Sequence, residues 1–188
     1  YHSLHSIKRL LERHGLTLFD VTESPISGGS LVAYFSKSAR SPSAELDAML
    51  RFEDERGLAT LSSWQLFAKR SLQHRLDLKN MVEAEIRSGR KVVGYGASAR
   101  SSTLLNFACI NNTHLSCIAD QSPLKHGRYT PGTDVQILSP QQALAENPDT
   151  ILLLAWNFRE EILSTLSSYG FKGRVIVPLP GNPELIHL

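Results

Sequence analysis

Cysteine is scarce in this 188-residue sequence, and its scarcity limits the class of protein that the chain can encode. The only two cysteines, Cys109 and Cys117, are too few for a disulfide framework. They also lack the paired spacing that a structural zinc site needs. We therefore expect no metal site, and we expect a protein of a reducing compartment, with a cytoplasmic location.

Strong charge and long apolar runs are missing as well. The formal net charge is only +2, and no run of lysine or arginine concentrates it. This balance argues against a nucleic-acid partner and against a membrane-surface partner. No apolar run reaches the length of a membrane span, and residues 1–10 are amphipathic rather than signal-like. The apolar fraction of 41% is typical of a chain that buries an ordinary core.

Motifs that would assemble a catalytic site are also absent from the sequence. It contains no G-x-S-x-G, no H-E-x-x-H, and no serine, histidine and aspartate that the pattern brings into one site. His2, His5 and His14 lie on or at the end of the first expected helix, where packing or surface roles are commoner. We therefore predict no catalytic residue here. The chain starts without methionine and in mid-pattern, so we expect it to be part of a longer protein.

The residue pattern divides the chain into three regions. The first contains two expected strands, and the second contains none. Residues 1–37 predict a helix followed by strands at 16–21 and 31–35, too little to form a domain alone. Residues 38–90 predict helices. The second of these, at about 62–88, has an apolar stripe that we expect to pack on a neighbouring domain.

The third region, residues 91–188, alternates strands with helices. We expect strands at 91–95, 115–119, 150–155 and 174–177, and helices at 98–110, 140–145 and 158–169. The strands are continuous apolar runs, as expected when helices cover both faces of a parallel sheet. The sequence therefore predicts an α/β fold, a small Rossmann-like, doubly wound parallel sheet.

A glycine-rich turn follows the first strand of this third region. The run from Gly94 to Ala99 fits G-x-G-x-x-A between a strand and a helix. We expect Gly94 to allow a tight turn, Gly96 to let a ligand approach the backbone, and Ala99 to keep the helix close to the sheet. The turn either binds a phosphate-bearing ligand or is a tight connection without one. Its candidate substrate-binding residues are Gly94, Tyr95, Gly96, Ala97, Ser98 and Arg100.

The end of the second strand carries further candidates. Asp120 lies 24 residues after Gly96, where an acid would hold a ribose hydroxyl, although a turn aspartate is the alternative. The following loop carries Lys125, Arg128 and Tyr129, and cations there suit phosphate oxygens. A solvated loop without a ligand is the alternative for these three residues.

The third strand ends in Ala-Trp-Asn. Trp156 could stack on a base or a sugar. Asn157 either contacts the ligand or caps the following helix, and capping is the commoner role for an asparagine in this position. We include both residues among the candidate substrate-binding residues.

Three motifs in this order resemble the C-terminal domain of SAM-dependent sugar C-methyltransferases. They occupy residues 94–107, 120–133 and 155–157. Members of that family act on nucleotide-linked deoxysugars, typically 4-keto forms. Residues 1–37 resemble the last helix and last two strands of the family's methyltransferase domain. The sequence departs from the family at Ser27, where a histidine that would assist proton transfer commonly precedes two glycines.

The resemblance implies a division of labour. Residues 1–37 would be the tail of a class I methyltransferase domain, 38–90 a helical connector, and 91–188 a Rossmann-like substrate-binding domain. In the whole enzyme a base would remove the proton at C3 of the sugar, and the resulting enolate would attack the methyl group of SAM. The family's catalytic Glu-His pair, SAM glycines and zinc cysteines have no counterpart in this sequence.

The same resemblance implies the partners of this chain. They are a nucleotide-diphosphate sugar and the upstream methyltransferase domain of the same protein. The chain alone would be inactive and would bind no cofactor. Two alternatives stay open: an NAD(P)-binding, oxidoreductase-type Rossmann domain, which rests on the glycine turn and Asp120, and a non-catalytic scaffold domain whose turn binds nothing.

Overall fold

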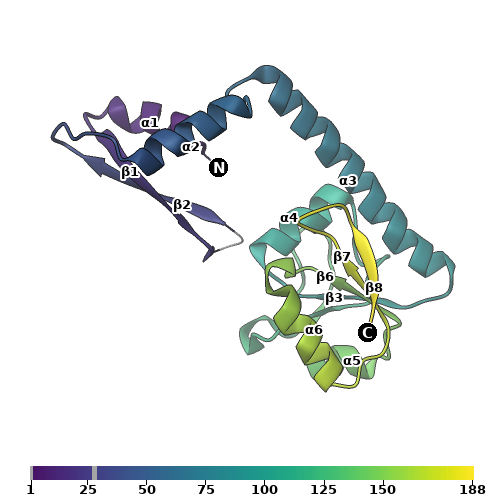
Figure 1. Cartoon of the computed structure of the whole chain (residues 1–188). Coiled ribbons are helices and arrows are strands. Elements are labelled where there is room, and N and C mark those ends of the chain that lie inside the picture. The colour runs from purple at the N-terminus through teal and green to yellow at the C-terminus, as the bar shows by residue number, and fades with distance from the viewer. Residues whose placement is uncertain (1, 27–28) are drawn as a thin grey trace. The chain divides into compact units, whose positions relative to one another are not determined.

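The computed structural model describes residues 2–26 and 29–188 and divides the chain into two compact units (Figure 1). The first unit is Tyr1–Arg70 and the second is Ser71–Leu188. Ser27, where the sequence departs from the family pattern, lies outside the described residues. No helix within the described part of the chain is both long enough and apolar enough to cross a membrane.

The described residues of the first unit form two complete helices, one antiparallel strand pair and the start of a third helix. Its elements are α1 (Leu4–Glu12), β1 (Thr17–Ser24), β2 (Ser30–Ser36) and α2 (Ala44–Glu55). Its buried apolar residues are Leu4, Leu18, Val21 and Leu46. The helix and the two strands lie where the sequence predicts them. That they are the tail of a methyltransferase domain stays a prediction.

A buried glutamate fixes the start of α1. The Glu53 carboxylate accepts hydrogen bonds from the backbone N–H groups of Leu4, at 2.7 Å, and His5, at 3.1 Å. Ser3 acts as the N-cap, and its hydroxyl accepts from the N–H of Ser6. A negative charge at a helix N-terminus satisfies unpaired donors and complements the helix dipole. Glu53 therefore ties α2 to the first turn of α1.

The long helix expected at about 62–88 is α3 (Leu61–Arg87), which begins in the first unit and ends in the second. Leu78 and Val82, near its C-terminal end, are fully buried in the core of the second unit. Trp64 and Phe67, near its N-terminal end, are more than half exposed. The predicted stripe is thus buried only towards one end, and a partner for the rest stays a prediction.

The second unit is built on a six-stranded, mostly parallel sheet of order β5-β4-β3-β6-β7-β8. Only β8 is antiparallel to its neighbour. This arrangement agrees with the predicted Rossmann-like fold. Its elements are β3 (Val92–Tyr95), α4 (Ala99–Ala108), β4 (Ile118–Ala119), β5 (Ile137–Leu138), α5 (Pro140–Ala145), β6 (Thr150–Leu153), α6 (Arg159–Ser168), β7 (Arg174–Val177) and β8 (Glu184–His187).

Helices cover both faces of this sheet. Alternate residues such as Val92 and Leu152 pack with α3 and α4, whereas their chain neighbours Val93 and Leu153 pack with α5 and α6. Because successive side chains of a strand point to opposite faces, each strand must be apolar throughout. This is why the strands read as unbroken apolar runs in the sequence.

Two strands, β5 and β8, escape prediction from the sequence, and β4 is shorter than predicted. β4 and β5 have two residues each, and so short a segment carries no periodic signal. The prediction of a strand over 115–119 is therefore too long. β8 pairs with β7 antiparallel, with Val175 opposite Ile186. That pairing depends on a partner strand rather than on local pattern.

A second buried glutamate joins α3 to the sheet. Glu85 accepts hydrogen bonds from Arg90 (Nε, 2.7 Å), Thr150 (Oγ1, 2.7 Å) and Arg174 (Nη1, 3.0 Å). Burial alone would raise the pKa of this carboxyl, but these hydrogen bonds outweigh it and hold the pKa below its ordinary value. The ionised carboxylate therefore ties the end of α3 to β6 and β7.

Candidate functional site

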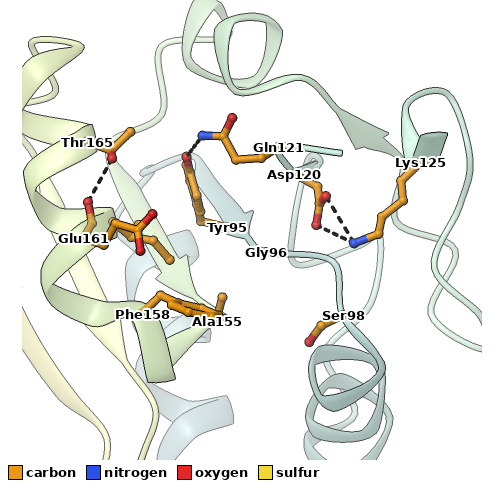
Figure 2. A pocket seen from close by; sticks show the side chains of 11 residues that line it. Tyr95, Gly96, Ser98, Asp120, Gln121, Lys125, Ala155, Phe158, Glu161 and Thr165 are labelled. Carbon is orange, nitrogen blue, oxygen red and sulfur yellow. Dashed lines mark hydrogen bonds and ion pairs between the residues drawn. The ribbon is translucent and has the colours of Figure 1, made fainter. Parts of the chain in front are cut away.

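The strand order creates a crevice at the carboxyl ends of β3 and β6. From β3 the chain continues to β4 and β5 on one side, and β6 then pairs with the other side of β3. In open α/β sheets ligands bind at such a switch point. A cavity of about 300 Å³ lies there (Figure 2). Its lining residues are Tyr95, Gly96, Ser98, Asp120, Gln121, Lys125, Ala155, Phe158, Glu161, Ile162 and Thr165.

The two glycines of the motif are required for different reasons, and only Gly96 lines the cavity. Gly96 has φ +99°, and a Cβ atom there would lie 2.5 Å from the Cβ of Ala155. Both the backbone conformation and the close approach of Ala155 therefore require glycine. Gly94 lies within β3, where a Cβ would come within 3 Å of Ile118 and Leu154. Its role is close packing in the sheet rather than the tight turn that the sequence predicts.

Backbone N–H groups of the glycine turn are already used within the protein. The N–H of Gly96 donates to Ala119 O at 2.7 Å, and that of Ala97 donates to Asp120 Oδ2 at 2.7 Å. Ser98 and Ser101 form a reciprocal capping box at the start of α4, so their N–H groups are satisfied too. These four donors are the kind of group that a phosphate takes at such a turn.

Asp120 clamps the turn to the loop that follows β4. Its carboxylate is almost completely buried and accepts from the N–H groups of Ala97 and Ser122. Lys125 Nζ lies 3.0 Å from Asp120 Oδ2 and also donates to Ala97 O at 2.8 Å. The ion pair faces one side of the cavity (Figure 2). The carboxylate that the NAD(P) alternative requires for a ribose hydroxyl is thus occupied by protein groups.

Tyr95 forms the polar wall at the end of β3. Its side chain is almost completely buried, and its hydroxyl accepts a hydrogen bond from Gln121 Nε2 at 3.0 Å (Figure 2). Burial raises the pKa of the Tyr95 hydroxyl above its ordinary value, although the Gln121 hydrogen bond acts in the opposite direction. The hydroxyl is therefore protonated at neutral pH and is available as a hydrogen-bond donor.

One face of α6 closes the cavity opposite the turn. Phe158 and Ile162 supply apolar surface, and Glu161 and Thr165 supply oxygen atoms. Figure 2 shows the Glu161 side chain extending from α6 towards Tyr95. The four residues are spaced i, i+3, i+4 and i+7, which places them on one side of a helix. That spacing is present in the sequence and is the signal by which these four residues could have been predicted.

Five of the twelve predicted site residues line the cavity, namely Tyr95, Gly96, Ser98, Asp120 and Lys125. The other seven are not among its described lining residues, and they are Gly94, Ala97, Arg100, Arg128, Tyr129, Trp156 and Asn157. Tyr129 is mostly exposed on the loop after β4. Contacts of all twelve residues with a substrate stay predictions.

The residues after β6 form the connection from this strand to α6. Trp156 is partly buried against the core. The interpretation of Asn157 as the cap of the next helix is wrong, because Phe158 holds the N-cap position of α6 without a side-chain hydrogen bond. A short 3₁₀ turn, Trp156–Phe158, makes the transition from β6 instead. Six lining residues are absent from the set predicted from the sequence, namely Gln121, Ala155, Phe158, Glu161, Ile162 and Thr165.

Fold and cavity together define a doubly wound α/β domain with a ligand-sized crevice at its switch point. The family model described as "C-methyltransferase C-terminal domain" matches residues 25–180, and the chain belongs to this family. The chain is also similar to the C-methyltransferase NovU of Streptomyces niveus, with 34% identity over 189 aligned positions. The match covers 99% of this chain and 45% of NovU, so the chain spans less than half the length of that relative. These findings confirm the family that the three motifs predict.

Proposed function

We propose that this chain is the C-terminal portion of a SAM-dependent C-methyltransferase and that it binds a nucleotide-diphosphate 4-keto-deoxysugar and orients it for methylation at C3. Membership of the C-methyltransferase family supports the reaction class. The three motifs of the second unit support the sugar substrate through their resemblance to sugar C-methyltransferases. Holding the reacting carbon in line with a methyl donor is itself a large part of catalysis.

The observation that carries the proposal is the cavity at the switch point. It combines apolar surface from Phe158 and Ile162 with polar groups from Tyr95 and Glu161. Ligand sites of this mixed kind recognise amphiphilic ring systems such as bases and sugars. Its volume of about 300 Å³ is at the lower end of such sites, so it would take part of a nucleotide sugar.

The methyl donor and the base that deprotonates C3 are assigned to a methyltransferase domain preceding the second unit. The glycine turn does not fit SAM, because the N–H groups of Gly96, Ala97 and Ser98 have protein partners. In this proposal residues 1–37 are the last elements of that domain. The two-stranded sheet of β1 and β2 supports this assignment, since a sheet of only two strands has marginal stability without neighbouring elements.

Calorimetric titration of the chain tests the proposal directly. We expect a dTDP-sugar to bind and NAD(P) not to bind. The bond between Asp120 and Ala97 disfavours the oxidoreductase alternative, because it occupies both the acid and an N–H group that a dinucleotide would use. Tight NAD(P) binding without a response to the nucleotide sugar would overturn the proposal. Absence of any nucleotide binding would favour the scaffold alternative.

A further inference from the structure

The charges around the cavity are unfavourable for a diphosphate. Its titratable lining residues are two carboxylates, Asp120 and Glu161, and one amine, Lys125, besides the neutral Tyr95. The amine is already paired with Asp120 at 3.0 Å and bound to Ala97 O. The lining therefore carries a formal negative charge. A group with several negative charges would meet repulsion there and would find few unpaired donors.

Several N–H donors of the glycine turn that could offset this charge are already bound within the protein. At a phosphate-binding turn the first N–H groups of the helix and its approach point at the anion. Here the Ala97 N–H is held by a carboxylate, and Ser98 and Ser101 satisfy each other. A phosphate would have to displace Asp120, which is also held by Lys125 and Ser122. The N–H groups of Ala97, Ser98 and Ser101 are therefore already bound within the protein.

A hydrogen-bond donor nevertheless points into the cavity. The Tyr95 hydroxyl accepts from Gln121, which leaves its own proton to donate. Among the residues that the structure describes, no acceptor is hydrogen-bonded to that proton. Tyr95 is 3% exposed, so leaving the donor unpaired is costly. An oxygen atom of a ligand would satisfy it.

The remaining walls suit a flat or puckered ring. Phe158 is 55% exposed despite its place in the cavity lining, so its ring offers a surface on which another ring can lie. Glu161 extends towards Tyr95 (Figure 2) and can accept from an N–H or hydroxyl next to the ligand oxygen. The Tyr95 hydroxyl can thus donate to an oxygen atom of a ring, and the Glu161 carboxylate can accept from an N–H or hydroxyl next to that oxygen.

We propose that the cavity binds an uncharged ring of the nucleotide sugar, with Tyr95 donating to a ring-borne oxygen and Glu161 accepting from the neighbouring donor, while the diphosphate lies outside the glycine turn. This inference rests on the proposed function and deepens it. The ring is the pyrimidine base or the sugar, since both carry an oxygen acceptor beside an N–H or a hydroxyl.

The test is calorimetry of the 188-residue chain with dTDP-glucose as the probe. Tyr95→Phe removes only the hydroxyl, and we expect it to weaken binding about tenfold, the value of one hydrogen bond in a buried site. Tyr169→Phe is the matched control, since this half-exposed tyrosine does not line the cavity, and it should leave the affinity unchanged. Circular dichroism shows whether both variants are folded.

Competition experiments identify the ring. Displacement of dTDP-glucose by thymidine, with thymidine itself bound more weakly by Tyr95→Phe, places the base in the cavity. The same pair of results for methyl glucoside places the sugar there, and either supports the inference. Displacement by inorganic pyrophosphate alone, or equal affinity of the wild type and Tyr95→Phe, overturns it while leaving the proposed function in place. No binding of dTDP-glucose at all overturns both the proposed function and the inference.

Discussion

The second unit buries both faces of its sheet, whereas the first unit buries a much smaller core. Helices on both sides of the second sheet enclose two apolar clusters. The strand pair of the first unit has one cluster with four buried members. On β2, Leu31, Val32 and Tyr34 are each about 40% exposed. The second unit therefore carries the larger stabilising core, whereas the first unit buries little apolar surface of its own.

Both units also bury a glutamate, but the two carboxylates stabilise different features. Glu53 accepts from two backbone N–H groups of one helix end. Glu85 accepts from two arginines and a threonine, and so connects a helix to two strands. Both carboxylates join elements that are distant in the sequence, but Glu53 binds one helix end, whereas the network around Glu85 joins a helix to two strands.

The largest expected difference between the units comes from core truncation. Leu152→Ala removes a fully buried side chain from the second unit and should cost about 3–5 kcal/mol. Leu46→Ala in the first unit should cost about 2–3 kcal/mol, because a small, partly open core collapses more easily around the cavity.

Each unit contains one tryptophan, which makes this difference measurable. Trp64→Phe leaves Trp156 to report the second unit, and Trp156→Phe leaves Trp64 to report the first. Urea unfolding followed by fluorescence in these backgrounds gives the two stabilities. If each substitution lowered the free energy of unfolding equally by both tryptophan signals, the two units would unfold as one cooperative unit, and the difference between their cores would be contradicted.

Removal of the buried charges should have the next largest effect. Glu85→Gln leaves Arg90 and Arg174 without a carboxylate partner and should cost about 3 kcal/mol in the second unit. Glu53→Gln, the matched change in the first unit, weakens a helix cap and should cost about 1 kcal/mol. Urea unfolding with the same two reporters measures both. A larger loss for Glu53→Gln would reverse the proposed roles.

Acid should weaken the second unit through Glu85. The folded-state pKa of this carboxyl lies below its unfolded value, so its contribution is present above the unfolded value and is lost as the pH falls through the folded one. Stability measured with Trp156 should therefore decrease on acidification. In Glu85→Gln this decrease should be shallower. An unchanged pH profile in the variant would show that other groups control acid unfolding.

The smallest perturbation is chemical labelling of thiols. Cys117 is buried in the second core, and burial raises the pKa of its thiol to about 11, so in Cys109→Ser it should stay unlabelled by a thiol reagent at about pH 8. A matched probe, Val21→Cys with both native cysteines replaced by serine, lies equally deep in the first unit. It should label faster, because the smaller core opens more often. Faster labelling of Cys117 would contradict the contrast between the units.

The strand and turn from Val92 to Ala99 could be predicted from the sequence because their causes are local. An apolar run predicts a buried strand, and Ser98 at the start of α4 is a favourable N-cap. The requirement for glycine at position 96 also follows from backbone conformation, φ +99°. The helix and strands of the first unit follow from the same local rules.

The functions of Gly94 and Asp120, in contrast, depend on neighbours that are distant in the sequence. Position 94 has no room for a Cβ atom because the side chains of Ile118 on β4 and Leu154 just after β6 lie against it. Asp120 has the position of a ribose-binding acid, but its carboxylate binds Ala97 and Lys125. These contacts leave no trace in the local pattern, although the turn alternative for Asp120 agrees with its local hydrogen bond from the N–H of Ser122.

The α/β class, the glycine turn and the family to which the chain belongs all follow from the sequence alone. Those properties rest on strand and helix periodicity, on glycine conformation and on motifs read in order along the chain. The composition of the cavity, by contrast, depends on the tertiary fold. It brings Gln121 and Glu161 beside Tyr95 and pairs the Ala97 N–H group with Asp120. Strand order sets these contacts, because it places the ends of β3, β4 and β6 together at one edge of the sheet.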